Sequence, residues 1–114
     1  ANYVHHFALQ LYDAGGLYTL SNQPSSEMTA NRIEQLGNAP YATNDRAFYI
    51  YFDEATDGYR VKDNWCPEPL FDANRPGPAN VWINNGPTVS DSIKSAAGLQ
   101  PEYNYLKDSI HETN

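Results

Sequence analysis

Short runs of hydrophobic residues alternate with polar turn segments through the first three quarters of the chain. The runs are rich in aromatic and β-branched residues and too short for helices, which favours β-strands. Segments rich in Gly, Pro, Asn and Asp separate them, for example residues 13–16, 21–24 and 75–78. No hairpin-type Asn-Gly lies at the centre of two paired runs. The pattern predicts strands at residues 3–4, 17–20, 48–52, 59–61 and 81–83.

Helix signals appear only near the end of the chain. Ser90 or Asp91 can cap a short helix that stops at Gly98. Pro101 can open a second short helix that runs through residues 105–106, with Lys107 near its end. We therefore expect two parts, a β-rich part at residues 1–89 and a C-terminal helical cap or tail at residues 90–114.

A 33-residue repeat runs through the β-rich part. Shifting the chain by this distance places hydrophobic on hydrophobic residues and asparagine on asparagine. Because both kinds of position match at one offset, stacked coils explain the pattern better than the frequency of asparagine in turns does. The matched pairs are Leu17 and Ile50, Tyr18 and Tyr51, Met28 and Val61, Asn31 and Asn64, and Ile33 and Cys66.

The asparagine frame recurs outside this repeat at other spacings. Asn84 follows Asn64 by 20 residues and lies three residues after Val81. Asn31 follows Asn2 by 29 residues. Coils of unequal length with a constant local frame are typical of a solenoid whose loops vary. Inward asparagines can then bond along the stack and satisfy backbone groups of the turns. The sequence predicts an all-β solenoid of about four parallel β-coils.

Four segments resemble those of a known superfamily in the same order. They are "DAGGLYTLSNQP" at residues 13–24, "ANRIEQLG", "YIYFDEATDGYRVKDNW", and the terminal "AAGLQPEYNYL". Together they resemble the C-terminal part of right-handed parallel β-helix proteins, the pectin-lyase-like superfamily of carbohydrate-active enzymes. The likeness is greatest to its glycoside hydrolase branch. The resemblance implies an extracellular or periplasmic protein that acts on carbohydrate without a cofactor.

The chain departs from the superfamily in two ways. Ala14 replaces the first Gly of an Asp-Gly-Gly run, which is acceptable only if that residue does not need a positive φ. Members of the superfamily are several hundred residues long, whereas this chain has 114. An open first coil would expose unpaired strand edges. We therefore expect an upstream segment or another chain to complete the β-helix.

Glycoside hydrolysis needs two carboxylates, about 5–5.5 Å apart for retention or roughly 6.5–9.5 Å apart for inversion. The resemblance favours Asp13 and Asp53 as this pair, with Glu54 as second choice for either role. Each aspartate can equally be a turn former that bonds its own backbone, and Glu54 can be a solvated or salt-bridged side chain. A calcium site built from Asp53, Glu54 and Asp57 is a further reading.

Residues around the acids suggest a surface for a sugar. If Asp53 points outward, strand alternation places Tyr51 and Tyr49 on the same face, with Tyr18 stacked on Tyr51. Such a ledge could stack on a sugar ring, or it could be an ordinary aromatic ladder between coils. Arg46 could hold the substrate or the other acid. Of the adjacent His5 and His6 only one can face the cleft, where it could bond Asp13; a surface histidine is the alternative.

Charge and composition narrow the classes of partner. The chain has 14 acidic and 7 basic residues, a formal charge of −7, and offers no basic stripe for nucleic acid. The same charge disfavours polyanionic substrates and favours a neutral polysaccharide. No apolar run approaches the roughly 18–20 residues that span a bilayer. Cys66 is the single cysteine, and no third His or Cys joins the histidines at metal-ligand spacing, so we expect no zinc site.

Two other functions remain compatible with these residues. A polysaccharide lyase of the same fold would need a basic residue as catalyst and cations to neutralise a uronate, and the 7 basic residues are scattered. A non-catalytic carbohydrate-binding or structural β-helix would need neither acid, because a fold does not fix a function.

Overall fold

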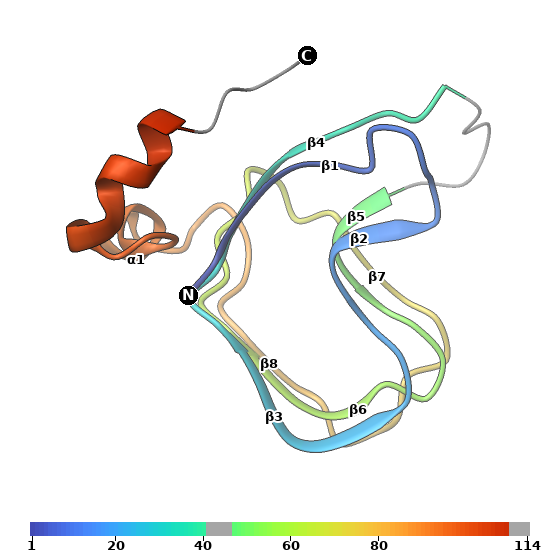
Figure 1. The fold of residues 1–114 in the computed structure, drawn as a ribbon. Coiled ribbons are helices and arrows are strands. Elements are labelled where there is room, and N and C mark those ends of the chain that lie inside the picture. Colours follow the sequence, from blue (N-terminus) through green and yellow to red (C-terminus); the bar gives the residue numbers. More distant parts are fainter. Residues whose placement is uncertain (41–46, 110–114) are drawn as a thin grey trace.

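The computed structural model of the protein describes residues 1–40 and 47–109. Eight strands run through the described part of the chain, and two short helices follow them (Figure 1). In chain order the elements are β1 (Tyr3–Phe7), β2 (Ala14–Thr19), β3 (Asn22–Thr29), β4 (Arg32–Leu36), β5 (Ala47–Phe52), β6 (Asp57–Lys62), β7 (Phe71–Ala73), β8 (Val81–Ile83), α1 (Asp91–Ala96) and the 3-10 helix η1 (Pro101–Ser109).

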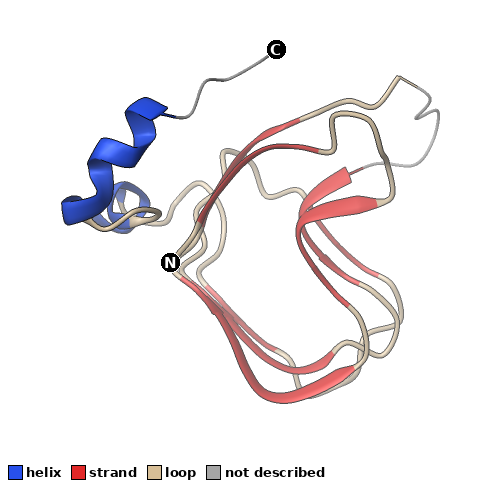
Figure 2. Cartoon of the chain, in the orientation of Figure 1, coloured by secondary structure: helices blue, strands red, loops and turns tan. Residues whose placement is uncertain are grey.

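The strands form three parallel sheets that enclose one core (Figure 2). The sheet orders are β1–β4, β2–β5–β7 and β3–β6–β8, so each sheet takes one strand from each successive coil. The coils wind clockwise as they recede from the viewer in Figure 1, which is a right-handed path. The protein is therefore a right-handed parallel β-helix, as the sequence predicts.

Three of these strands are absent from the sequence prediction. β3 includes residues expected to form a turn, and its sequence NQPSSEMT is mostly polar and exposed. The other two are β4 and β7. Backbone pairing with the neighbouring coil creates these strands, because a parallel neighbour supplies hydrogen bonds to any sequence that can lie extended.

The 33-residue repeat is confirmed by the strand register. Leu17 pairs with Ile50, Tyr18 with Tyr51, and Met28 with Val61. Matched positions thus stack on the same side of adjacent coils. Stacking of this kind builds the core, whose residues with at most 1% exposure include Ile33, Ile50, Val61 and Cys66.

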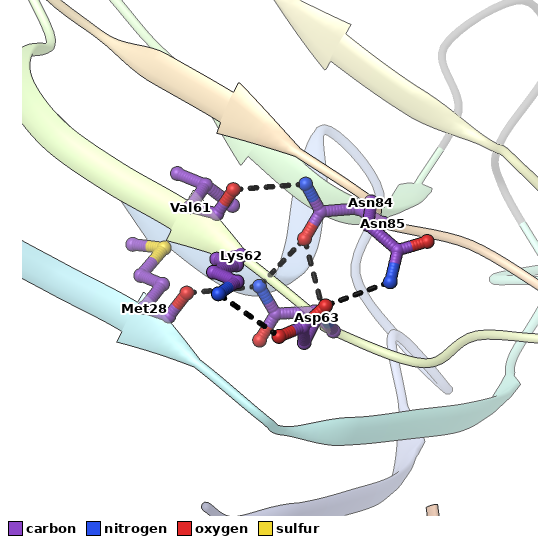
Figure 3. Close-up of polar contacts among 7 residues, drawn as sticks. Met28, Val61, Lys62, Asp63, Asn84 and Asn85 are labelled. Atoms are coloured by element: carbon purple, nitrogen blue, oxygen red, sulfur yellow. Dashed lines mark hydrogen bonds and ion pairs between the residues drawn. The ribbon is translucent and has the colours of Figure 1, made fainter. Parts of the chain in front are cut away.

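The predicted asparagine ladder is present in the structure. The side-chain amide of Asn2 donates to Oδ1 of Asn31 at 3.1 Å, and that of Asn31 donates to Oδ1 of Asn64 at 2.8 Å. The amide of Asn64 donates in turn to Oδ1 of Asn85 at 2.8 Å. Asn85 ends the series by donating to the carbonyl of Val61 at 3.0 Å (Figure 3).

The prediction of Asn84 as the last ladder residue is wrong by one position. Asn84 instead donates to the Asp63 carboxylate at 2.7 Å (Figure 3). The ladder residue in each turn follows a residue with positive φ, and Asn84 is such a residue (φ 51°), like Asp63 (φ 56°) and Ala30 (φ 57°). The last spacing is therefore 21 and not 20, in agreement with the register of Val61 on Trp82.

The substitution of Ala14 for glycine is tolerated because the left-handed position falls one residue earlier. Asp13 has φ 52°, and Ala14 is not among the residues with positive φ. Aspartate adopts this region more readily than most residues. Residue 14 therefore does not need a positive φ, which was the condition for alanine at this position.

The helices lie outside the coils, at the corner that holds the N-terminus (Figure 2). The Gly98 N–H donates to the Ala1 carbonyl at 3.2 Å, and the Lys94 ammonium lies 3.7 Å from the centre of the Trp65 ring. Gly98 has φ 100°, and a Cβ there would lie 3.0 Å from Cβ of Tyr3. Neither helix within residues 1–40 and 47–109 is long and apolar enough to cross a membrane.

Cys66 is expected to resist alkylation in the folded protein. Its side chain is fully buried, and burial, with the charge of Glu68 in second place, raises the pKa of the thiol to about 12. Labelling by iodoacetamide at pH 8 should be at least about 100-fold slower than in denaturant, because the thiolate is the reacting form. Mass spectrometry of timed samples measures both rates. Equal rates in buffer and denaturant would contradict the buried position.

Candidate functional site

The outer face of the β2–β5–β7 sheet carries two neighbouring tyrosines from adjacent coils. Tyr18 of β2 lies in register with Tyr51 of β5, and their ring centroids are 5.4 Å apart in an edge-to-face arrangement. Tyr18 is 47% exposed, whereas Tyr51 is 6% exposed. Phe48 packs on Tyr51 from the same strand, with their ring centroids 5.6 Å apart. Tyr18 is therefore the tyrosine of this pair whose ring is exposed to solvent.

Tyr49 does not belong to this surface, contrary to the expectation from strand alternation. It is 4% exposed and lies in the core cluster with Ile33 and Ile50, where the centre of its ring lies 6.0 Å from that of Phe7. Tyr49 and Ile50 both enter the core, so the alternation is interrupted at this point of β5. Gly16 lies beside them, and a Cβ there would be 2.5 Å from Cγ2 of Ile33.

The Asp53 carboxylate follows β5 and accepts three hydrogen bonds. Oδ1 accepts from the Glu54 N–H at 2.8 Å and from the Asn74 amide at 2.9 Å, while Oδ2 accepts from the Tyr18 hydroxyl. The bond from Tyr18, then those from Asn74 and Glu54, lower the pKa of Asp53, and the charge of Arg75 acts in the same direction. Asp53 is thus held as a carboxylate.

The Tyr18 hydroxyl remains protonated throughout the physiological range. The hydrogen bond to Asp53 and then burial raise the pKa of Tyr18 to about 12, with smaller effects from the charges of Asp53, Asp13 and Glu54. The hydroxyl is therefore a permanent donor to the Asp53 carboxylate.

Asp13 reaches the same tyrosine pair from the turn before β2. Burial raises the pKa of Tyr51 to about 12, followed by the charges of Asp13 and Asp53 and by a hydrogen bond to Asp13. Both aspartates also contribute charge at Tyr18. The Asp53 carboxylate is therefore hydrogen-bonded to Tyr18, and the Asp13 carboxylate lies near enough for its charge to raise the pKa of both tyrosines.

Glu54 has a different environment from its neighbour. Its carboxylate forms an ion pair with Arg75, and the two side chains are 54% and 76% exposed respectively. Exposed pairs of this kind contribute little to stability. The Glu54 carboxylate is therefore paired with a cation in solvent. Its negative charge also contributes to the raised pKa of Tyr18.

Two further residues were expected to bind substrate. Arg46 falls outside the described residues. His6 lies in β1, in a different sheet from β2, which Asp13 precedes, and its Nδ1 is 2.7 Å from Nδ1 of His5. His5 in turn stacks on Tyr3, with their ring centroids 4.5 Å apart.

Asn74 touches Asp53 directly, although the sequence pattern did not single it out. It lies 21 positions after Asp53, the same spacing as from Asn64 to Asn85. Asp72, which pairs with Tyr51, was missed for the same reason. Recognition of the 21-residue coil would have placed both residues beside the tyrosine pair.

No group of three or more His, Cys, Asp or Glu residues within the described ranges 1–40 and 47–109 could hold a metal ion. Asp57, considered with Asp53 and Glu54 as a calcium ligand, begins β6 in another sheet. Its Oδ1 accepts the Ala79 N–H at 2.6 Å. This bond gives Asp57 a role in the turn that precedes β8.

A pocket of about 590 Å³ lies between β1 and the C-terminal helices. Its lining includes Tyr3, His5, Gln35 and Lys107, but neither of the aspartates. His5 thus lines this pocket, whereas Asp13 and Asp53 flank strands β2 and β5 of another sheet.

No family model and no curated protein matches the chain. A solved structure described as a glycoside hydrolase does match it. The TM-score is 0.89 with 41% sequence identity over 93% of this chain. The chain spans 18% of the length of that structure. The protein therefore resembles part of a glycoside hydrolase, in agreement with the branch that the four sequence segments indicate.

Proposed function

We propose that the chain forms part of a β-helix glycoside hydrolase whose acid pair is Asp13 and Asp53. The observation that carries this proposal is that Asp53 is hydrogen-bonded to Tyr18 of β2, while Asp13 directly precedes the same strand and its charge reaches both Tyr18 and Tyr51. Hydrolysis requires two such groups on either side of the scissile bond. Glu54 is a weaker candidate because Arg75 pairs with its carboxylate.

A neutral polysaccharide is the substrate class that the surface favours. The exposed Tyr18 ring can stack on the apolar face of a sugar, and its neighbours at this sheet are acidic. The chain as a whole carries a charge of −7, which repels polyuronates. We assign the sugar contact to Tyr18, because Tyr51 is only 6% exposed and supports the Tyr18 ring, and keep Arg46 and His6 as further contacts to be tested.

The first coil offers its open edge to a further coil, from an upstream segment or from another chain. β1, β2 and β3 are each the first strand of a sheet. Because each ladder asparagine accepts from the one before it, Oδ1 of Asn2 is where an asparagine of a preceding coil would donate. We propose residues 1–89 as coils of this larger β-helix, residues 90–114 as its helical tail, and an extracellular or periplasmic location.

Incubation of the full-length protein with neutral and uronate-containing polysaccharides tests this function. New reducing ends without an unsaturated product support hydrolysis, and proton NMR of the released sugar then distinguishes retention from inversion. Ultraviolet absorbance of an unsaturated uronate would indicate a lyase instead. Binding without any cleavage would identify a carbohydrate-binding or structural β-helix and refute the proposal.

A further inference from the structure

Three successive coils meet at the Asp53 carboxylate. Tyr18 belongs to the coil before it and donates to Oδ2, while Asn74 belongs to the coil after it and donates to Oδ1 at 2.9 Å. The N–H of Glu54 donates to Oδ1 at 2.8 Å. Both oxygens of one carboxylate are therefore fixed from opposite directions along the stack.

We propose that Tyr18 and Asn74 are positioning residues that hold Asp53 as the ionised member of the acid pair. Asp53 is then the general base or nucleophile, and proton donation falls to Asp13. This inference rests on the proposed hydrolase function and assigns the roles within it.

The geometry favours the charged form of Asp53 because all three partners donate. The Glu54 N–H and the Asn74 amide are fixed donors and cannot accept a proton from a neutral carboxyl group. Protonation of Oδ2 would force the Tyr18 hydroxyl to turn from donor to acceptor and would replace charge-assisted hydrogen bonds with weaker neutral ones. The lowered pKa of Asp53 agrees with this reasoning.

The charged surroundings come from three elements of the chain. Arg75, after β7, is the cation that acts on Asp53. The anions near the tyrosine pair are Asp13 before β2, Glu54 after β5 and Asp72 in β7. Two hydrogen-bonding side chains and a cation therefore offset the repulsion of the neighbouring carboxylates at Asp53.

These roles give a balanced reaction in either stereochemical course. With inversion, Asp53 takes a proton from water, and the water oxygen bonds to the anomeric carbon as the glycosidic bond breaks. With retention, a carboxylate oxygen of Asp53 forms the bond to the anomeric carbon, and water later displaces it while Asp13, ionised by the first step, takes the water proton. In both courses the leaving oxygen takes the proton of Asp13.

A carbon NMR titration of the 114-residue chain, labelled at the aspartate carboxyl carbons, tests the positioning without any substrate. In Tyr18→Phe and in Asn74→Ala, the midpoint of Asp53 should move to higher pH, because each variant removes one donor to the carboxylate. Asn84→Ala is the matched control. It removes an Asn-to-Asp bond of 2.7 Å between neighbouring coils in another sheet and should leave the Asp53 midpoint unchanged.

Kinetics of the full-length protein test the catalytic role. The acid limb of the kcat/KM profile should move to higher pH in Tyr18→Phe and Asn74→Ala, because the base must be ionised and its pKa rises when a donor is lost. Loss of orientation should also lower kcat by roughly 10- to 100-fold. Asn84→Ala should reproduce the wild-type profile.

An unchanged Asp53 midpoint in both folded variants would overturn the positioning role, whatever the activity. A changed midpoint with an unchanged acid limb would overturn Asp53 as the base or nucleophile. Circular dichroism establishes that each variant is folded. Absence of any glycosidic cleavage by the wild-type protein would refute the proposed hydrolase, and with it the catalytic role, while the titration still decides whether Tyr18 and Asn74 hold the carboxylate.

Discussion

Asp53→Asn and Asp13→Asn are each expected to lower kcat for glycosidic cleavage by at least about 10³-fold, with KM little changed. An amide matches the carboxylate in size but can neither take nor give the required proton. In Asp53→Asn the new side chain would keep an oxygen for the Glu54 N–H and the Asn74 amide, and the Tyr18 hydroxyl can rotate to accept from its NH₂ group. The fold should therefore survive the substitution, so the loss reports chemistry.

Asp63→Asn is the matched control for this pair of variants. Asp63 also ends a strand, and it accepts from an asparagine of the next coil, but it lies in another sheet. Release of reducing ends should stay near the wild-type rate. If Glu54→Gln is inactive while Asp53→Asn retains its activity, the assignment of the pair is wrong and Glu54 takes the place of Asp53.

Asn64→Ala should destabilise the protein by about 3–5 kcal/mol, a large part of the total stability of a domain this size. The Asn64 side chain is fully buried and joins three coils. It accepts from the Asn31 N–H at 3.1 Å and from the Asn31 amide at 2.8 Å. It donates to the Met28 carbonyl at 2.9 Å and to Asn85 at 2.8 Å. Alanine would leave these buried partners without their bonds, each at a cost of about 1–3 kcal/mol when water cannot replace it.

Urea unfolding followed by circular dichroism measures this change, and two neighbouring asparagines calibrate it. Asn85→Ala should be destabilising because Asn85 holds the end of the ladder. Asn84→Ala should cost only about 1 kcal/mol, because Asn84 is exposed and loses one bond to Asp63 at a left-handed position. Equal losses for Asn84→Ala and Asn85→Ala would contradict the 21-residue register.

A constant spacing of 33 residues between β2 and β5, and along most of β3 and β6, explains why the repeat is visible in the sequence. In the 33-residue register, Leu17 pairs with Ile50 and Met28 pairs with Val61. The two residues of each pair lie side by side in adjacent coils and face the same side of their sheet. Identical spacing keeps hydrophobic positions in phase, so the sequence alone reveals the stacking. The inward asparagines give the same register independently.

The next coil is shorter, and two of the prediction errors fall in it. Because its register is 21 residues and not 20, the sequence prediction chose Asn84 in place of Asn85 as the ladder residue. For the same reason it missed the contact between Asn74 and Asp53. β7 is short, with only the sequence FDA, which gives almost no pattern to align. A single asparagine frame cannot distinguish a spacing of 20 from one of 21, whereas the backbone can, since the ladder residue must follow the left-handed residue of the turn.

The sequence by itself determined the parallel β-helix, the 33-residue register, and the choice of Asp13 and Asp53 as candidates, because these depend on residues and segments that recur in a fixed order and spacing. Only the tertiary structure showed that Asp53 bonds to Tyr18, that Tyr49 lies in the core, and that Asn74 lies beside Asp53. The physical reason is that hydrogen bonds between coils depend on the register of each coil and on which wall a side chain faces. Both are set by loop lengths and local twists that leave no periodic trace in the sequence.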